Sequence, residues 1–322
     1  MTGLSSSAGK PIPLTQTGVD REARLRTDDA WLQKAWADPK TRVIVVEDSQ
    51  ALMRTGDGAA ELIFVEPAQA PDGIRFFLGL DPDDVAYFGV IGTPPEPAPE
   101  PGDGDDGSVK RAGLREAGHL MADRDAGLLT HAIALANWHA VSHFCSRCGS
   151  PTEPITSGHA RKCTNDGSEH FPRCDPAVIM LVADPDDRCL LARNAAWPEH
   201  RVSILAGFVE PGESAEQAVA REVHEEVGLV ITKLSYSGSQ PWPMPHNIML
   251  GYRAEVTDTE IKVDADEIAE AAWYSRDELR AAIESGELLM PPSPSISRWL
   301  IETWYGGPLP RAPKPPVPPA AS

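Results

Sequence analysis

The chain has 322 residues, 41% of them hydrophobic, and a formal net charge of −19. This length suits two or three domains with buried cores, and the charge argues against a general electrostatic grip on nucleic acid or anionic lipid. No apolar run is long enough to span a membrane, and the opening MTGLSSSAGK lacks the layout of a secretion signal. We therefore expect a cytoplasmic protein with no membrane partner.

The first half of the chain predicts a small β-rich domain. Residues 1–20 are small and polar, and we expect a disordered tail. The N-terminal domain is placed at 21–140, with an acidic, proline-rich loop at 93–107 that has nothing to bury. Apolar residues at helical spacing predict a helix over 123–143. Three runs rich in β-branched and aromatic residues predict strands: 42–48, 61–67 and 74–80.

The second half begins with a cysteine-rich segment, 141–174, and continues as an α/β region that we place at 175–305. A proline-rich tail, 306–322, cannot sustain a helix or a sheet ladder, so we expect it to be disordered. Compact apolar runs of the α/β region predict strands near 177–183, 189–193, 203–206, 248–256 and 271–274. Helices are expected near 215–227, 275–285 and 295–305.

The stretch GFVEPGESAEQAVAREVHEEVGL concentrates acidic side chains on one helix. Ser214 with Gln217 forms a capping-box pattern and Gly228 supplies a stop, which predicts the helix over 215–227. Arg221 lies at the edge of the acidic patch, where it can hold one carboxylate and fix its rotamer. Three glutamates share an arc of about 100° on this helix: Glu222, Glu225 and Glu226.

Two interpretations of these glutamates compete. The first is a solvated acidic face, in which like charges cost a few tenths of a kcal/mol per pair. The second is a cation site, favoured by the tight glycine loop GFVEPGE, which brings backbone groups close to the patch. Sites dominated by carboxylate oxygens suit Mg²⁺ or Mn²⁺, which usually bind together with substrate phosphates. The sequence favours the cation site.

The spacing of Gly207, Glu213 and the run from Arg221 to Leu229 resembles the Nudix box at every defined position. The resemblance implies an α/β fold, a Nudix α/β/α sandwich, that hydrolyses a nucleoside diphosphate linked to another group. It further implies that two or three Mg²⁺ or Mn²⁺ ions bind per site, and that one box glutamate orients or deprotonates water. It does not tell which glutamate is the base. The implied catalytic and metal-binding residues are Glu222, Glu225 and Glu226.

The segment SQPWPMPHN, 239–247, follows the box. Its three prolines exclude a central strand and predict a stiff surface loop. The segment resembles the SQPWPFPxS signature of NADH pyrophosphatases, with Met244 in place of Phe and Asn247 in place of Ser. Met is a soft apolar replacement that is expected to retain the packing of the loop. The resemblance implies these substrate-binding residues: Gln240, Pro241, Trp242, Pro243, Met244, Pro245, His246 and Asn247.

Other segments are similar to the same family. In HFPRCDPAVI and in the box loop, Phe171 and Phe208 match positions that stack on the two faces of adenine, with core packing as the alternative. Glu267 matches a further metal-ligating glutamate, and Ala206 would offer its backbone carbonyl to the metal. Ser297 matches a position whose backbone touches the substrate.

Four of the five cysteines lie between positions 145 and 174, and in a cytosolic chain such clustering favours metal binding over disulfides. Cys145 and Cys148 have the spacing of half a zinc knuckle, and Cys163 follows. The zinc ribbon of the family would place a fourth cysteine where this chain has Asp166, which is a less common structural zinc ligand. The fourth zinc ligand is then Asp166 or Cys174, or the site binds no metal.

The resemblance implies metal-dependent hydrolysis of the pyrophosphate bond of NAD(H) to AMP and NMN(H). Removal of an NAD cap from an RNA 5′ end breaks the same bond and is a natural second activity. The first alternative is a Nudix hydrolase of another compound, such as ADP-ribose or a dinucleoside polyphosphate. The second is a non-catalytic nucleotide sensor, against which the three intact glutamates argue. The resemblance also implies a homodimer.

Overall fold

A computed structural model describes residues 11–15, 18–95 and 108–311 of the chain. The predicted disordered tails and the predicted acidic loop at 93–107 lie largely outside these residues. Where the tails are described, the prediction of disorder is wrong, because the side chains of Ile12, Leu14 and Leu309 are buried. Each is an apolar side chain in a polar or proline-rich segment, and each removes its apolar surface from water.

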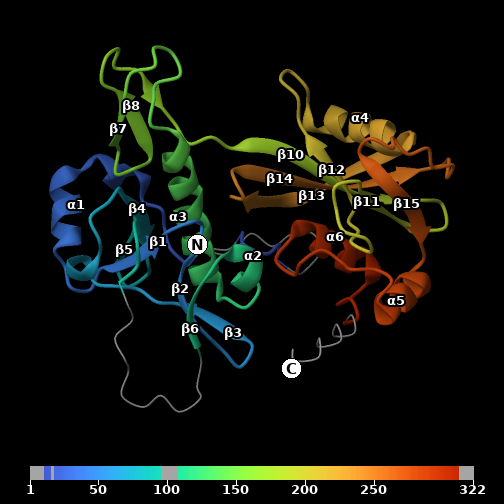
Figure 1. The fold of residues 1–322 in the computed structure, drawn as a ribbon, viewed down its shortest axis with the longest axis horizontal. Helices are drawn as coiled ribbons and strands as arrows, with labels where there is room; N and C mark the ends of the chain where they lie inside the picture. Colours follow the sequence, from blue (N-terminus) through green and yellow to red (C-terminus); the bar gives the residue numbers. More distant parts are fainter. Residues whose placement is uncertain (1–10, 16–17, 96–107, 312–322) are drawn as a thin grey trace, which may run out of the picture. The chain divides into compact units, whose positions relative to one another are not determined.

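The contacts divide the described chain into two compact units, which are coloured along the sequence in Figure 1. The first unit consists of residues 13–15, 18–95, 108–175 and 241–248. The second consists of residues 11–12, 176–240 and 249–311. The short segment 241–248 thus belongs by its contacts to the first unit, although the chain on either side of it belongs to the second.

The first unit contains more strands than helices, as the sequence predicts for the N-terminal domain. Its elements in chain order are η1 (Ala23–Thr27), α1 (Asp29–Trp36), β1 (Arg42–Val46), β2 (Ala51–Gly56), β3 (Ala59–Leu62), η2 (Pro67–Gln69), β4 (Arg75–Leu80), β5 (Ala86–Ile91), β6 (Ser108–Ala112), α2 (Leu114–Ala117), α3 (Asp123–Val141), β7 (Thr152–Ile155), β8 (Ala160–Cys163) and β9 (Glu169–His170).

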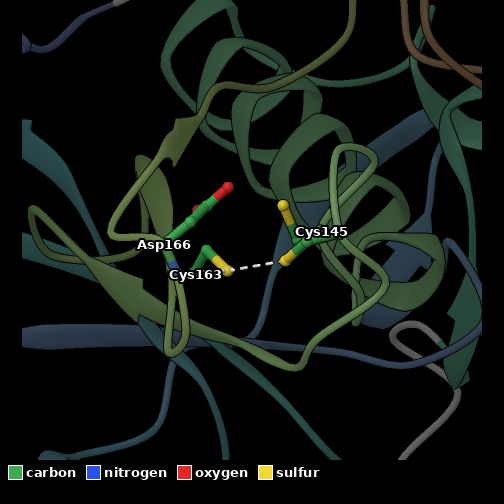
Figure 2. Close-up of side chains that lie close together, drawn as sticks. Cys145, Cys163 and Asp166 are labelled. Atoms are coloured by element: carbon green, nitrogen blue, oxygen red, sulfur yellow. Dashed lines mark hydrogen bonds between the residues drawn. The ribbon is translucent and has the colours of Figure 1, made fainter.

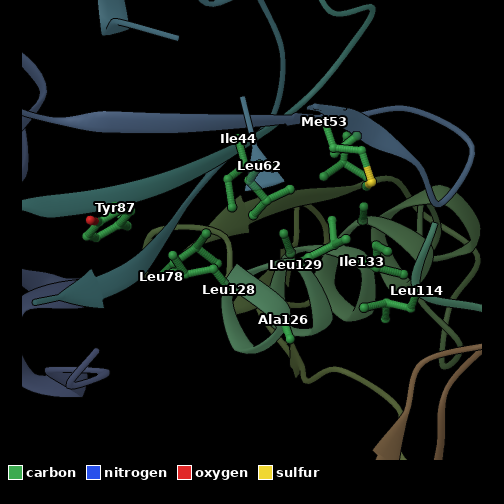
Figure 3. Close-up of a cluster of buried hydrophobic side chains, with 14 of the residues drawn as sticks. Ile44, Met53, Leu62, Leu78, Tyr87, Leu114, Ala126, Leu128, Leu129 and Ile133 are labelled. Carbon is green, nitrogen blue, oxygen red and sulfur yellow. The ribbon is translucent and has the colours of Figure 1, made fainter. Parts of the chain in front are cut away.

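Three small sheets organise this unit. One has the order β1-β5-β4, with β1 parallel and β4 antiparallel to β5, and another has the order β3-β2-β6. The core lies between these sheets and α3, where Leu129 and Ile133 of the helix pack with Ile44 and Met53 of the strands (Figure 3). The third sheet, β7-β8-β9, is a short antiparallel ribbon that carries the cysteines.

The second unit begins with the long apolar strand that follows the cysteines. Its elements are β10 (Asp175–Ala183), β11 (Cys189–Asn194), β12 (Leu205–Phe208), α4 (Ala215–Val227), β13 (Ile231–Trp242), β14 (Asn247–Val256), β15 (Ile268–Tyr274), α5 (Arg276–Ser285) and α6 (Ile296–Tyr305). Among them, β13 includes residues that contacts assign to the first unit.

Five strands form the path β13-β14-β10-β11-β15, and β12 pairs with β10. Side chains of β10 alternate between the two faces of the sheet, because successive residues of a strand point to opposite sides. Val178 and Met180 pack with the valines of α4, whereas Ile179 and Leu181 pack with α5 and α6. Figure 1 shows α4 on one side of this sheet and α5 and α6 on the other. The predicted α/β/α sandwich is thereby confirmed.

In the part of the chain that the structure describes, no helix combines the length and the apolar character needed to cross a membrane.

Candidate active site and metal centre

The acidic helix α4 has the predicted bounds, Ala215–Val227. At its start, the backbone N–H of Gln217 donates to Ser214 Oγ (3.2 Å) and the Ser214 N–H donates to Gln217 Oε1 (3.0 Å). At its end, Gly228 adopts φ 73°, a left-handed conformation that suits glycine. Both ends are therefore fixed by local chemistry, which sets the phase of the helix and the direction of its glutamates.

The glutamates of α4 do not form a solvated face. Glu222 is 8% exposed and Glu226 is 6% exposed, whereas Glu225 is exposed. The backbone of Gly207 on β12 lies so close to Glu222 that a Cβ at Gly207 would sit 1.9 Å from the Glu222 carboxyl carbon. Only glycine fits there. Burying two carboxylates is costly without a compensating partner, so their burial favours the cation interpretation.

Arg221 is the partner of three carboxylates. Its Nε donates to Glu213 Oε1 (2.9 Å) and its Nη2 to Glu213 Oε2 (3.0 Å), a bidentate pair. Its Nη1 donates to Glu222 (2.8 Å) and to Glu225 (2.9 Å), and Nη2 also donates to the Phe208 carbonyl (2.9 Å). The guanidinium thus joins the loop before the helix to two of the three box glutamates and fixes their rotamers.

Glu226 is the box glutamate that Arg221 does not reach. Its Oε2 is buried and, among the described residues, has no hydrogen-bond partner. Burial raises the pKa of this carboxyl to about 8, helped by the charges of Glu222, Glu267 and Glu225. Burial also raises the pKa of Glu222. This carboxyl oxygen is buried, has no partner in the described residues, and is affected by the charges of other carboxylates. A bound cation would supply a partner and neutralise these charges, so the arrangement favours a cation site.

Glu267 reaches this region through a turn that is bonded to the end of α4. The Asp264 N–H donates to the Glu226 carbonyl (3.1 Å), and the Glu267 N–H donates to the Asp264 carbonyl (3.2 Å). The charge of Glu267 contributes to the raised pKa of both Glu222 and Glu226. The acidic group is therefore made of residues from α4 and from the start of β15. Its donor set is oxygen only, which fits a hard divalent cation.

The two predicted adenine-stacking residues are not core residues. Phe171, which follows β9, is 67% exposed, and Phe208, at the end of β12, is 56% exposed. The alternative of core packing is therefore wrong for both. Ala206 precedes Phe208 by two residues and is also exposed, and it pairs with Ile179 of β10. Exposed aromatic side chains of this size are available to a flat ligand.

The SQPWPMPHN segment is only partly a loop. Strand β13 continues through Trp242, and a turn at 243–246 leads into β14. Pro241 is tolerated within β13 because this strand lies at the edge of its sheet. Gln240 is fully buried, its amide donating to the Pro294 carbonyl (2.7 Å) and accepting from the Ile296 N–H (2.8 Å).

The remaining predicted substrate residues lie in or beyond the turn. Asp175 Oδ2 lies 3.3 Å from His246 Nδ1, and the Asp175 N–H donates to the His246 carbonyl (2.9 Å). Asn247 begins β14, and its buried Oδ1 has no partner in the described chain. Ser297, on α6, is buried, and its hydroxyl lies 2.7 Å from that of Ser203.

The cysteine-rich segment contains two turns of the same construction. In the first, the Cys145 N–H donates to the Ser150 carbonyl (2.8 Å), and the Gly149 N–H donates to the Cys145 carbonyl (2.9 Å). In the second, the same two bonds join Cys163 to Ser168 (2.8 Å) and Gly167 to Cys163 (3.2 Å). Both glycines have a φ of just over 70°. Asp166 therefore occupies in the second turn the place of Cys148 in the first.

The ligand atoms of Cys145, Cys148, Cys163 and Asp166 all lie within 4.8 Å of one another, and Figure 2 shows three of these side chains converging. The prediction had left the fourth position open between Asp166 and Cys174. Cys174 is exposed and is not a member of this group. Within the described ranges, no other group of His, Cys, Asp and Glu side chains is gathered in this way.

Hydrogen bonds favour the ionised forms of Asp166, Cys145 and Cys148 in this group, whereas the pKa of Cys163 is raised by burial despite the backbone N–H of Asp166. The Ser168 hydroxyl lies 2.6 Å from Asp166 Oδ1 and 3.5 Å from Cys145 Sγ. This hydroxyl lowers the pKa of Asp166 to about 2 and is the leading cause that lowers the pKa of Cys145 to about 7. Three thiols and a carboxylate in one small volume fit a zinc ion.

Comparison with known proteins agrees with this arrangement. The family model described as "NADH pyrophosphatase-like rudimentary NUDIX domain" matches residues 40–138. "NADH pyrophosphatase zinc ribbon domain" matches 142–171, and "NUDIX domain" matches 174–291. The NAD-capped RNA hydrolase NudC of Mycobacterium bovis (strain BCG / Pasteur 1173P2) is 41% identical over 312 residues, which cover 92% of this chain and 95% of that protein. This chain belongs to the NADH pyrophosphatase family of Nudix hydrolases.

Two further relatives extend the comparison. The NAD-capped RNA hydrolase NudC of Mycobacterium tuberculosis (strain ATCC 25618 / H37Rv) is 40% identical, over 92% of this chain and 95% of that protein. The human NAD-capped RNA hydrolase NUDT12 is 38% identical over 196 residues, 57% of this chain and 42% of that protein. In this chain the three family models follow one another as a rudimentary Nudix domain, a zinc ribbon and a Nudix domain.

Some residues around the site were missed by sequence reasoning. The box spacing marked Glu213 but gave it no task, and the structure makes it the bidentate partner of Arg221. Asn137 and Arg115 contact the segment after β13, and neither was marked. No local pattern could have found these two, because the bonded residues are more than one hundred positions apart in the chain.

Proposed function

We propose that this Nudix hydrolase cleaves the pyrophosphate bond of NAD(H) to give AMP and NMN(H), and that it also removes NAD caps from RNA 5′ ends. The observation that carries the proposal is the acidic group of α4, in which Glu226 Oε2 is buried and has no hydrogen-bond partner among the described residues, in a chain that matches NAD-capped RNA hydrolases over 92% of its length. The NADH pyrophosphatase domain models, matched at 40–138 and 142–171, point to the same bond.

The metal proposed at this site is Mg²⁺ or Mn²⁺, two or three ions per site. Glu222, Glu225, Glu226 and Glu267, with the Ala206 carbonyl, would hold the ions. When bound, such ions neutralise the diphosphate and lower the pKa of a bound water. Arg221 supports the site by fixing the carboxylates of Glu222 and Glu225, and the 8% exposure of Glu222 limits the access of bulk water.

The residues proposed to bind each half of the substrate are assigned by the chemistry of their side chains. Phe171 and Phe208 would stack on adenine, since both present large exposed aromatic faces. The segment Gln240–Asn247 would recognise the nicotinamide side, with the buried Gln240 amide holding the segment in place rather than contacting the ligand. Ser297 would contribute its backbone. Binding of an anionic dinucleotide through metal also agrees with a net charge of −19.

A structural zinc ion is the second proposed metal. Cys145, Cys148, Cys163 and Asp166 would bind it, because their ligand atoms already lie within 4.8 Å of one another. Its task would be to stabilise the two turns and the β7-β8-β9 ribbon, since a structural zinc site contributes directly to folding. We place the domains at 21–140, 141–174 and 175–305, and expect a cytoplasmic homodimer; these remain predictions.

Product analysis tests the proposed reaction. The protein is incubated with NADH and Mg²⁺ or Mn²⁺, beside Glu225→Gln, and the products are separated by mass. AMP and NMNH from the wild type, with little from the variant, support both the bond and the metal site. Intact NADH beside cleaved ADP-ribose would contradict the nicotinamide assignment and leave the Nudix reaction standing. If the RNA body binds to the protein, the rate of capped-RNA cleavage should fall steeply as the salt concentration rises. The rate of NADH cleavage should fall much less.

A further inference from the structure

The turn that follows β13 belongs to the first unit, and it is hydrogen-bonded to α3 of the same unit. Asn137 Nδ2 donates to the Pro243 carbonyl (2.8 Å) and to the Pro245 carbonyl (3.4 Å). The Pro243 carbonyl belongs to the peptide group that precedes Met244, and the Pro245 carbonyl belongs to the peptide group that precedes His246. One side-chain amide therefore ties two peptide groups of the turn, one before and one after Met244. Pro243 and Pro245 supply no backbone N–H of their own, and the Met244 N–H donates to the Trp242 carbonyl (2.7 Å), so the Asn137 amide adds donors that the prolines cannot supply.

The orientation of Asn137 is itself fixed. The Ser49 hydroxyl lies 2.8 Å from Asn137 Oδ1, which leaves Nδ2 toward the turn. Asn137 lies four residues before the end of α3, and its neighbours Ile133 and Ala136 on this helix belong to the core of the first unit. The donor is thus held on a rigid element, which is the arrangement that keeps a binding loop in one conformation.

Arg115 makes a second contact with the same turn. Its Nε lies 3.3 Å from Met244 Sδ, and its guanidinium carbon lies 5.7 Å from the centroid of the Trp242 ring. Within the described residues, Arg115 forms no ion pair, whereas its neighbour Arg111 pairs with Glu47. Met244 stands where the signature of the family has Phe, and only the thioether sulfur offers an acceptor to the Nε–H.

We propose that Asn137 and Arg115 are positioning residues for recognition of the nicotinamide half of the dinucleotide. They act through Trp242 and Met244, whose side chains are only partly buried against the first core and keep surface for a ligand. This inference rests on the proposed function. It gives the rudimentary Nudix domain a task in the reaction, because a turn ordered in advance lowers the entropy lost when the ligand binds.

The test compares NADH kinetics of Asn137→Asp with those of the wild type at saturating Mn²⁺. The aspartate keeps an oxygen for Ser49 and loses both donors to the turn. We expect KM for NADH to rise about 10-fold or more, since two hydrogen bonds are lost, with kcat changed less than about 3-fold. The thermal midpoint of unfolding should stay close to that of the wild type.

Arg115→Ala is the second variant. Because Arg115 is exposed, we expect this substitution to leave folding intact. We expect its KM for NADH to rise roughly 2- to 5-fold, as suits a contact at an exposed site. Arg111→Ala is its matched control, with the same charge removed from the preceding strand β6, and its KM should equal that of the wild type. Product inhibition sharpens the test. The inhibition constant of NMN should rise in Asn137→Asp and Arg115→Ala, and that of AMP should not.

The outcomes separate the two proposals. If the wild type does not cleave NADH, the proposed function fails before any variant is compared. If the wild type cleaves NADH and both variants keep its KM and its NMN inhibition constant, the inference is overturned. A fall in kcat and in thermal midpoint with KM unchanged would also overturn it, because that pattern belongs to a residue that only stabilises the fold.

Discussion

The two proposed metal centres of this molecule are built in opposite ways. In the cysteine-rich ribbon, backbone hydrogen bonds of two matching turns bring three thiols and the Asp166 carboxylate within 4.8 Å of one another. On α4, the carboxylates of Glu222 and Glu225 are tied to Arg221, and Glu226 is left buried and without a partner in the described structure. The ligand atoms of the ribbon are thus gathered before any metal binds. In the candidate active site, two glutamates are bonded to an arginine instead, and the third has no partner among the described residues.

The difference follows from what each site must do. A structural zinc site is closed, and its ligands serve folding. A hydrolytic site must admit ions together with the phosphates of a substrate and then release products. In the proposed mechanism, Arg221 would balance the charges of Glu222 and Glu225 when no ion is bound, and burial, which raises the pKa of Glu226, would favour its protonated carboxyl until a cation replaces the proton. Each of the following changes should affect one centre and spare the other.

Glu226→Gln gives the largest expected effect. The amide keeps the shape of the side chain and removes the charge that a cation needs, so kcat for NADH should fall by roughly 10²- to 10³-fold. Steady-state kinetics with Mn²⁺ measures this, and the zinc content of the variant should equal that of the wild type. A variant with more than half of the wild-type kcat would remove Glu226 from the active site.

Arg221→Lys should weaken the active site by a smaller factor. Lysine keeps one charge and cannot reproduce the fork that binds Glu213, Glu222 and Glu225 together. Because a group that orients metal ligands typically contributes 10- to 100-fold in affinity, we expect the Mn²⁺ concentration for half-maximal activity to rise by about that factor. Arg193→Lys is the matched control, since among the described residues Arg193 forms an ion pair with the exposed Glu270 alone. Equal Mn²⁺ curves for the two variants would contradict the role of Arg221.

Cys163→Ser tests the ribbon. Loss of one thiolate should release the zinc and lower the thermal midpoint of unfolding by about 5 °C or more, because metal binding is coupled to folding. Zinc is measured by elemental analysis and the midpoint by calorimetry. Cys174→Ser is the control and should keep both values, because Cys174 lies outside the ligand group. Zinc loss from Cys174→Ser instead would assign the fourth ligand position to Cys174.

The stability of the metal-free protein should depend on pH through Glu226. The pKa of this carboxyl is raised from its ordinary value of 4.5 to about 8 in the folded chain. Between these two pH values, the folded state therefore holds a proton that the unfolded state has released. The contribution of Glu226 to stability is therefore fully present below about pH 4.5 and is lost as pH rises to about 8, with a loss on the order of 1 kcal/mol or more. Denaturant unfolding in chelator at pH 5.5 and 8 measures the difference, which should shrink in Glu226→Gln. An unchanged difference would contradict the raised pKa.

Sequence reasoning reached the parts of the molecule that local chemistry determines. The bounds of α4 follow from Ser214, Gln217 and Gly228, which are caps within or beside the helix itself. The sequence also places Asp166 at the same spacing from Cys163 that Cys148 has from Cys145, and the two turns of the ribbon have this spacing. In these cases the residues that specify the structure are neighbours in the chain, so the sequence alone carries the information.

Sequence reasoning missed what depends on distant partners. Strand β13 was not predicted, because its run ITKLSYSGSQPW mixes polar residues and a proline that only an edge position tolerates. The ends of the run ELIFVEP were also misjudged, since β3 stops at Leu62, where the N–H of Leu62 donates to Asp125 of α3. Gln240 was expected at the substrate, but its burial depends on carbonyl and amide groups that lie more than fifty residues away.

Metal content and activity, followed together through chelation, test the two-centre account most directly. The purified protein is dialysed against buffer without divalent ions, with a weak chelator present only long enough to remove Mg²⁺ and Mn²⁺, its zinc is quantified, and NADH hydrolysis is assayed before and after Mg²⁺ or Mn²⁺ is returned. The account predicts that one zinc per chain stays bound while activity is lost, and that Mg²⁺ or Mn²⁺ alone restores the activity. Hydrolysis that persists without added metal, or that returns only with zinc, would contradict it.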